Sequence, residues 1–416
     1  MPSLCLYFQV HQPLRIKKYR VFDVGQDHKY FNDISNSNLN NLRVLDKVAK
    51  KSYLPANQLL LKLLRKYREF KVSFSFSGIF LEQILKYFPK VLKSFDRLIQ
   101  TGRVELLSET YYHSLAFFFS LPEFESQVNL HSELIKKLFG VETCVFRNTE
   151  LAYNNNLAVW ADKKGYKAIL AEGWDKFLGW RSPNFVYRPK GTRKIKLLLK
   201  NYRLSDDIAF RFSEKGWNEW PLTVNKFVHW INNLNGNGQV VNLFMDYETF
   251  GEHQWVEHGI FDFLEALPGT ILKYPDNGFV TPSEAANKYK PMDEVDVPYV
   301  VTWADTERDL SAWTGNQIQM SAINYIYSLE KKVLEKKNKN LNYKYKKFQI
   351  SDHFYYMCTK WFADGDVHKY FNPYESPYDA FICFMNAAKD LELRVKEKLG
   401  QISNKNYKDL VSVQQS

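Results

Sequence analysis

The chain has 416 residues, of which 45% are hydrophobic and 25% are charged. This composition is typical of a globular protein with a sizeable core and excludes a mainly disordered chain. No apolar run approaches the ~18 residues that a membrane span needs, so no membrane partner is predicted. The cysteines lie far apart without a C-x-x-C pair, and no basic segment precedes the first apolar run. These features predict reduced thiols, no signal peptide and a cytoplasmic protein.

The basic excess is concentrated in one segment. Lysine and arginine outnumber aspartate and glutamate by 57 to 46, which is compatible with a nucleic-acid partner. Much of the excess lies in residues 331–347, which we interpret as a solvated helix face and a loop, because no RNA-binding or zinc-finger motif accompanies it. We therefore predict no nucleic-acid partner. Aromatic residues make up 16% of the chain, and tyrosine and tryptophan near acidic groups suit a sugar-binding cleft.

In chain order, short apolar runs alternate with helical patterns up to about residue 300. The predicted strands are residues 4–10, 71–77, 104–107, 144–147, 168–171 and 240–245. The helical patterns between them often end at a glycine, such as Gly102, Gly140 or Gly165. This alternation predicts an α/β fold in which helices cover a parallel sheet, either a barrel or a doubly wound sheet.

Beyond residue 317 the pattern is helical only, over residues 317–336, 351–362 and 377–398. A change from alternating strands and helices to helices alone indicates a separate unit. We therefore predict an α/β domain over residues 1–315, an α-helical subdomain over 316–402 and a polar tail over 403–416.

Acidic or imidazole side chains follow five of the predicted strands. They are His11, Glu109 (with Glu105 inside its strand), Glu150, Glu172 and Asp246. Each of these residues alone is compatible with capping the next helix. Because the carboxyl ends of parallel strands form the face where α/β active sites are built, five in series predict several carboxylates around one rim.

Several other chemistries have no motif in this chain. It contains no G-x-G-x-x-G, no phosphate-binding G-x-x-x-x-G-K-[ST] and no G-x-S-x-G. A metal site built from His11, Asp246 and His253 remains an alternative, but without paired ligand spacing we expect these histidines to form hydrogen bonds. Two carboxylates in an aromatic-rich cleft are the arrangement that glycoside hydrolysis needs, although other acid–base reactions use such pairs too.

Four motifs, in order, resemble those of glycoside hydrolase family 57, the α-amylase and glucanotransferase group. They are HQP at 11–13, GRVEL at 102–106, FRNTEL at 146–151 and MDYETFG at 245–251, with a looser fifth match at 301–316. The resemblance implies that Glu150 is the nucleophile and Asp246 the acid/base. The substrate-binding residues that we predict are His11, Glu105, Trp174, Glu248, Trp255, Trp303, Asp309 and Trp313. One departure is Arg147, where several relatives have tryptophan.

The resemblance also implies a distorted parallel (β/α)7 barrel followed by a C-terminal α-helical subdomain, without a required metal or other cofactor. It implies a retaining mechanism on the α-1,4-glucosidic bonds of starch- or glycogen-type α-glucans, or maltooligosaccharides. Residues 351–356 and 376–379 resemble the α-amylase-type members. The alternatives are a 4-α-glucanotransferase or branching enzyme, an inactive glucan-binding relative, and a metal-dependent polysaccharide deacetylase.

The implied mechanism makes three demands on the protein. Asp246 must hold a proton near neutral pH, so its pKa must be raised, and the apolar Phe244, Met245 and Phe250 beside it would do so by desolvation. Glu150 must stay ionised, with Arg147 as a candidate counter-charge. Both carboxyl groups must also meet across one cleft.

Overall fold

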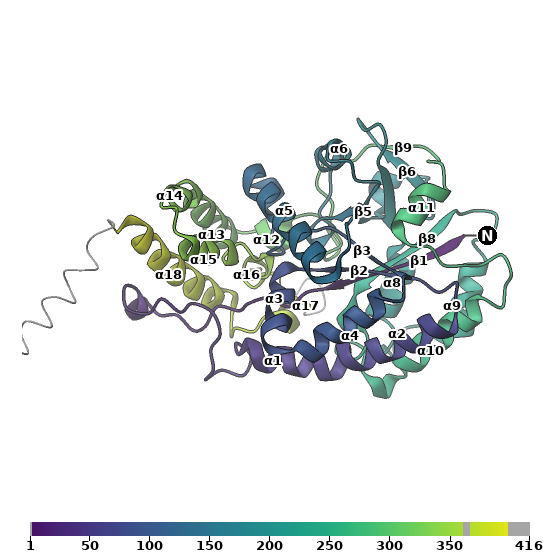
Figure 1. Ribbon diagram of the computed structural model, residues 1–416, viewed down its shortest axis with the longest axis horizontal. Coiled ribbons are helices and arrows are strands. Elements are labelled where there is room, and N and C mark those ends of the chain that lie inside the picture. The colour runs from purple at the N-terminus through teal and green to yellow at the C-terminus, as the bar shows by residue number, and fades with distance from the viewer. Residues whose placement is uncertain (1, 361–366, 398–416) are drawn as a thin grey trace, which may run out of the picture.

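A ring of parallel strands forms the core of the larger half of the molecule, at the right of Figure 1. The computed structural model describes residues 2–360 and 367–397. In spatial order the strands are β3 (Val104–Leu106), β2 (Val72–Phe76), β1 (Ser3–Val10), β8 (Val240–Asp246), β7 (Lys196–Lys200), β5 (Ala168–Glu172) and β4 (Val145–Arg147). Ser108, just past β3, forms a parallel bridge with Phe146 of β4 and so closes the ring. The expected (β/α)7 barrel is confirmed.

The barrel is distorted at β7, which the sequence analysis did not predict. A further strand, β6 (Val186–Pro189), pairs antiparallel with β7, and β9 (Glu294–Val295) pairs with β6. Between β7 and β8 only Lys200 and Asn242 are paired.

The strands are buried on both faces, as parallel strands covered by helices are. All eight residues of β1 are buried. Cys5 and Tyr7 point into the barrel, where they pack with side chains of other strands, whereas Leu6 and Phe8 pack outward against the helices. The short helix α11 (Pro282–Lys288) packs Ala285 and Ala286 into the same interior cluster, at the amino end of the strands.

Helices surround the barrel. They are α1 (Asn41–Val48), the π-helical η2 (Ala49–Tyr53), α2 (Leu54–Lys66), α3 (Gly78–Tyr87), α4 (Pro89–Ile99), α5 (Leu121–Phe139), α6 (Asn155–Lys163), α7 (Asp175–Leu178), α8 (Tyr202–Ala209), α9 (Val224–Asn232) and α10 (Ile260–Ile271). Local sequence sets their ends. The Ser120 hydroxyl accepts from Glu123 N at the start of α5, and Gly140, with φ 68°, ends it.

A helical region lies beside the barrel, at the left of Figure 1. It contains α12 (Ser311–Thr314), α13 (Gln317–Ser328), α14 (Glu330–Glu335), α15 (Lys339–Lys347), α16 (Ser351–Tyr355), α17 (Val367–Phe371) and α18 (Pro377–Lys396). Its core also contains Ile16, Tyr19, Tyr30 and Leu115 from the barrel half of the chain. The division at residue 315 stays a prediction, and the predicted tail, 403–416, lies outside the described residues.

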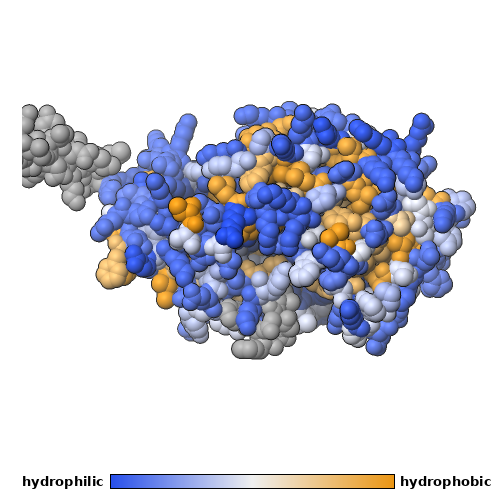
Figure 2. Space-filling view, turned by 90° about the horizontal axis from the view of Figure 1, so that it is seen from below, coloured by the Kyte–Doolittle hydropathy of each residue, from blue (hydrophilic) through white to orange (hydrophobic). Residues whose placement is uncertain are grey.

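Apolar side chains gather over the barrel half on the face drawn in Figure 2, whereas the helical half is mainly hydrophilic there. No helix in the described ranges has the length and apolar character needed to cross a membrane.

Candidate active site

Glu150 lies directly past β4, in the one-turn helix η4 (Thr149–Leu151). Its backbone is left-handed, with φ 59° and ψ 24°, a conformation that is rare and strained for a residue other than glycine. Trp303 Nε1 donates to Glu150 Oε2 at 2.7 Å, and His113 Nε2 donates to Oε1 at 3.1 Å. Both carboxylate oxygens are therefore held by donors.

His113 lies between two carboxylates. Its Nδ1 donates to Glu109 Oε2 at 3.3 Å while its Nε2 donates to Glu150. Burial alone would lower its pKa, but the two carboxylates raise it to about 9, so His113 is an imidazolium at neutral pH. In the same way, burial would raise the pKa of Glu109 and of Glu150, but His113 and Arg147 bring both below their usual range. Glu150 is therefore a carboxylate.

Arg147 supplies a second positive charge beneath the site. Its side chain is completely buried, with Nη1 at 3.7 Å from Glu109 Oε2 and the guanidinium 5.1 Å from the centre of the Trp303 ring. Among the described residues, none provides a hydrogen-bond partner for its three guanidinium nitrogens. The Arg147 side chain therefore acts through its charge and is not exposed for stacking on a sugar.

Asp246 ends β8 and faces the same group of charges. Burial raises its pKa, and the ionised Glu150 nearby raises it further, to about 6, although Arg147 and His113 act in the opposite direction. The structure thus brings Glu150 and Asp246 together and shifts their pKa values apart. Two nearby carboxyl groups with opposite pKa shifts are suited to act as a base or nucleophile and as an acid, respectively.

Glu248, predicted to bind substrate, faces the protein interior. Only 5% of the residue is exposed, and the Tyr53 hydroxyl donates to its Oε1. Burial, followed by the charge of Asp246, raises its pKa to about 8. Glu248 is thus a neutral, enclosed acid at pH 7, and the prediction of direct sugar contact is corrected.

The prediction that Glu105 binds substrate is also corrected. Its carboxylate accepts from Ser283 N at 2.9 Å, at the start of α11, and from Cys144 Sγ at 3.7 Å. Burial raises the pKa of Cys5, near the amino end of β1, and the nearby charge of Glu105 raises it further. Glu105 therefore lies at the amino end of the barrel, and Glu109, four residues later, is the acid that reaches the site.

His11 reaches the site, but both of its ring nitrogens have protein partners. Ser77 Oγ lies 2.6 Å from Nδ1, and Nε2 donates to Asp352 Oδ2 at 3.0 Å. Asp352 belongs to α16, in the helical region. His11 is therefore not free to bind a sugar hydroxyl as predicted.

His11, His113 and Asp352 form the one group of three potential metal ligands found in the described part of the chain, with ligand atoms within 4.8 Å of one another. The two imidazoles are stacked, with centroids 4.0 Å apart and an interplanar angle of 17°. An imidazole nitrogen binds an ion with a lone pair in the plane of its ring, and one ion cannot lie in two stacked planes. The group is therefore a hydrogen-bond network. His253, considered as a ligand from the sequence, is outside it.

Trp313 is buried, whereas Asp309 stays a predicted substrate-binding residue. Trp313 is 1% exposed and packs in the core of the helical region, so the predicted stacking on a sugar is excluded. Asp309 Oδ1 accepts from Ser311 N at 2.7 Å, at the start of α12.

Trp174 and Trp255 are accessible but contact other groups. Trp174 packs edge-on against Tyr299, with centroids 6.4 Å apart. Trp255 is 51% exposed and stacks on His258. Among the predicted aromatics, Trp303 is the one that the structure brings into contact with Glu150.

A second buried charge cluster borders the site. Arg308 Nη1 donates to Glu172 Oε2 at 2.8 Å, and Lys200 Nζ donates to Asp206 Oδ1 at 2.9 Å. Lys200 Nζ also lies 5.6 Å from the centre of the Trp303 ring. Glu172, the last residue of β5 and a member of the predicted series of acids, is thus paired with Arg308 and Lys200 inside the protein.

Sequence reasoning missed His113, Asp352 and Arg308. The spacing of Glu109 and His113, four residues apart behind a strand, is a signal that could have found His113. Asp352 lies in the segment 351–356 and Arg308 in the segment 301–316, both of which resemble the family, but no local pattern reveals their partners, which lie far away in the chain.

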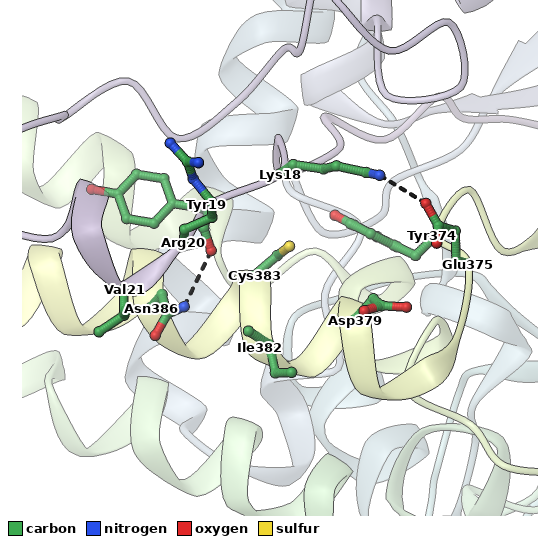
Figure 3. Close-up of a pocket in the computed structure, with 10 residues that line it drawn as sticks. All are labelled: Lys18, Tyr19, Arg20, Val21, Tyr374, Glu375, Asp379, Ile382, Cys383 and Asn386. Carbon is green, nitrogen blue, oxygen red and sulfur yellow. Dashed lines mark hydrogen bonds and ion pairs between the residues drawn. The ribbon is translucent and has the colours of Figure 1, made fainter.

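A pocket of about 420 Å³ lies elsewhere, between the N-terminal segment and α18 (Figure 3). Lys18 Nζ donates to Glu375 Oε1 at 2.8 Å, and Asn386 Nδ2 donates to Tyr19 O at 3.2 Å. None of the predicted site residues lines this pocket.

Comparison with known proteins identifies the family of the chain and supports the interpretation of its fold. The model of glycosyl hydrolase family 57 matches residues 5–298. A protein of Methanocaldococcus jannaschii named "Putative alpha-amylase" is 43% identical over 406 residues, which are 95% of this chain and 85% of the relative.

Solved structures share the fold. A GH57-type branching enzyme from Pyrococcus horikoshii gives a TM-score of 0.65 at 15% identity, covering 89% of this chain and 87% of that chain. The 4-alpha-glucanotransferase from Thermococcus litoralis gives 0.58 at 19% identity, covering 89% of this chain and 54% of that one. The family match and the M. jannaschii relative define the chain as a glycoside hydrolase. The chain belongs to glycosyl hydrolase family 57.

Proposed function

We propose that the chain is a retaining hydrolase of α-1,4-glucosidic bonds in starch- or glycogen-type α-glucans and maltooligosaccharides. The observation that carries this proposal is a pair of carboxyl groups at the carboxyl ends of barrel strands, in which His113 and Trp303 hold Glu150 and Asp246 ends β8. The opposite pKa shifts, Glu150 downward and Asp246 upward to about 6, agree with it. A carboxylate beside a carboxylic acid is the pair that retaining glycosidases use. The name of the M. jannaschii relative supports the α-amylase type, and the unpaired cysteines support a cytoplasmic location.

The reaction takes two steps. First, a Glu150 oxygen attacks the anomeric carbon, the bond to the leaving sugar breaks, and Asp246 donates its proton to the leaving oxygen. Then the Asp246 carboxylate takes a proton from water, whose oxygen attacks the same carbon and releases Glu150. The charges of His113 and Arg147 stabilise Glu150 as a nucleophile and as a leaving group.

Two substitutions test the proposal. We expect Glu150→Gln and Asp246→Asn each to reduce the rate on amylose by at least ~10³-fold without loss of the fold, since each removes a reacting group. An aryl α-glucoside with a good leaving group should partly rescue the Asp246 variant only, because its departure needs no proton. Glu105→Gln, at the amino end of the barrel, is the control and should keep its activity.

The product profile decides between the alternatives. Shorter reducing sugars alone indicate hydrolysis, whereas a ladder that includes longer products indicates a 4-α-glucanotransferase, and new branch points indicate a branching enzyme. Binding of α-glucan without any turnover by the unmodified chain would contradict the proposal and favour an inactive relative.

A further inference from the structure

The helical region supplies one side chain to the candidate active site. Asp352, in α16, is the carboxylate that holds His11, and His11 stacks on the histidine that holds Glu150. We propose that Asp352 is a positioning residue for Glu150, acting through the stacked pair His11 and His113. This inference rests on the proposed function of Glu150.

The hydrogen bonds of His11 define the state of its ring. The Asp352 carboxylate can only accept, so a neutral His11 must carry its proton on Nε2. The Ser77 hydroxyl, which accepts from Phe80 N at the start of α3, then donates its own proton to His11 Nδ1. Nδ1 is then an acceptor, and the ring proton lies on Nε2, from which it is donated to Asp352 Oδ2. Asp352 thus fixes both the tautomer and the orientation of His11.

A neutral His11 is what the stack requires. His113 is positively charged between Glu109 and Glu150, and a second charged imidazole 4.0 Å away would repel it. Burial and the charge of His113 lower the pKa of His11, in agreement with a neutral ring. The flat neutral ring covers one face of His113, while the two carboxylates hold its edges. Removal of Asp352 would free His11 to rotate and leave that face unsupported.

The backbone of the helical region reinforces the same arrangement. Ser351 N donates to His113 O at 3.0 Å, and Ile350 forms an antiparallel bridge with Ser114. His113 itself has a left-handed backbone, with φ 50°. The segment that carries Asp352 is therefore paired with the segment that carries His113, which fixes the distance between the two side chains.

The test compares two substitutions at position 352. Asp352→Leu removes the acceptor at similar volume, and we expect kcat to fall at least tenfold with KM within about twofold, since the substrate pocket remains and Glu150 loses its orientation. Asp352→Asn keeps an acceptor oxygen and should recover most of the loss. The matched control is Gln349→Leu, three residues earlier, which removes a buried hydrogen bond to Gln127 (2.9 Å) and touches neither histidine. This control should keep kcat.

A spectroscopic measurement separates this inference from the proposed function. In ¹⁵N-histidine NMR spectra of the full chain at pH 7, His11 should show the neutral Nε2–H tautomer and His113 the charged form. Asp352→Leu should change the His11 signals and Asp352→Asn should not. Unchanged signals and unchanged kcat in Asp352→Leu would overturn the inference. An unmodified chain that is inactive on every α-glucan would overturn the proposed function, while the NMR result would still decide the role of Asp352.

Discussion

At the scale of single residues, the site is a balance of charges that burial makes strong. Glu109 and Glu150 are anions beside the cations His113 and Arg147, whereas the pKa of the Asp246 carboxyl group is raised. Because these groups are shielded from water, removing one charge changes the pKa of the others by amounts that a pH profile can resolve.

The pH profile of kcat/KM provides the first residue-scale prediction. In the unmodified chain the rate should fall as the pH rises through about 6, because Asp246 then loses the proton that it must donate. His113→Gln removes a cation that lowers the pKa of both Glu150 and Asp246. The acidic limb of the profile, set by Glu150, and the basic limb, set by Asp246, should therefore both move to higher pH, by about one unit. The exposed His229→Gln is the control, and limbs that stay in place would contradict the assigned charge of His113.

Glu248 provides a prediction about stability. Its native pKa of about 8 lies above the ordinary 4.5, so between these pH values the folded state binds more protons than the unfolded state. Stability from this group is complete below pH 4.5 and is lost as the pH rises towards 8. Glu248→Gln should therefore reduce the difference between the free energies of unfolding at pH 5 and pH 8, measured with urea. Glu265→Gln, at an exposed position, should leave that difference as it is.

At the scale of elements, the loop between Thr302 and Ser311 is the part that brings Trp303 to Glu150. Thr302 N donates to Arg308 O at 3.0 Å, which closes the loop on itself. Arg308 then fastens it to the barrel through Glu172 and lies 4.2 Å from the centre of the Tyr202 ring. The position of Trp303 therefore depends on the ion pair between Arg308 and Glu172, which are not the reacting residues.

We expect Arg308→Met to destabilise the protein by ~3 kcal/mol, because Glu172 is left buried with one cation fewer. The same variant should lose kcat more than it raises KM, since Trp303 is no longer held against Glu150. Urea unfolding and steady-state kinetics measure the two effects. Arg188→Met removes an exposed pair with Glu294 and should cost no more than ~1 kcal/mol. Equal effects of the two substitutions would show that the loop does not depend on Arg308.

At the scale of the whole molecule, the helical region and the barrel share buried polar contacts as well as a core. Lys346 Nζ donates to both oxygens of Glu123 in α5, at 2.8 and 2.7 Å. Lys346 lies in the basic segment 331–347, which was interpreted as a solvated face, but it is only 5% exposed. For Lys346 that interpretation is wrong, because its ammonium group forms an ion pair with the buried carboxylate of Glu123 in α5.

Lys346→Met should lower the free energy of unfolding by about 3–5 kcal/mol, because it leaves the carboxylate of Glu123 buried and unpaired. Combining it with Glu123→Gln should restore part of the loss, which a double-mutant cycle in urea would measure. Lys331→Met, at an exposed ion pair with Glu335, is the control and should change stability by less than ~1 kcal/mol. If the double variant is no more stable than Lys346→Met alone, the buried charge is not the cause.

Sequence patterns identified most of the barrel but not β7. The residues 196–200 read KLLLK, so the strand is short and begins and ends with lysine. Lys200 is nevertheless buried, because Glu172 and Asp206 neutralise it. A charge that is paired only in the folded chain cannot be recognised as a strand residue from its neighbours in sequence.

By itself, the sequence determined the alternation of strands and helices and the family motifs that contain Glu150 and Asp246, because periodicity and motif order are local properties of the chain. Only the tertiary structure decided that Glu109 rather than Glu105 reaches the site, that Trp313 is core, and that Asp352 enters from the helical region. Each of these outcomes depends on which distant segments meet and on which charges are buried together, and both follow from packing in three dimensions.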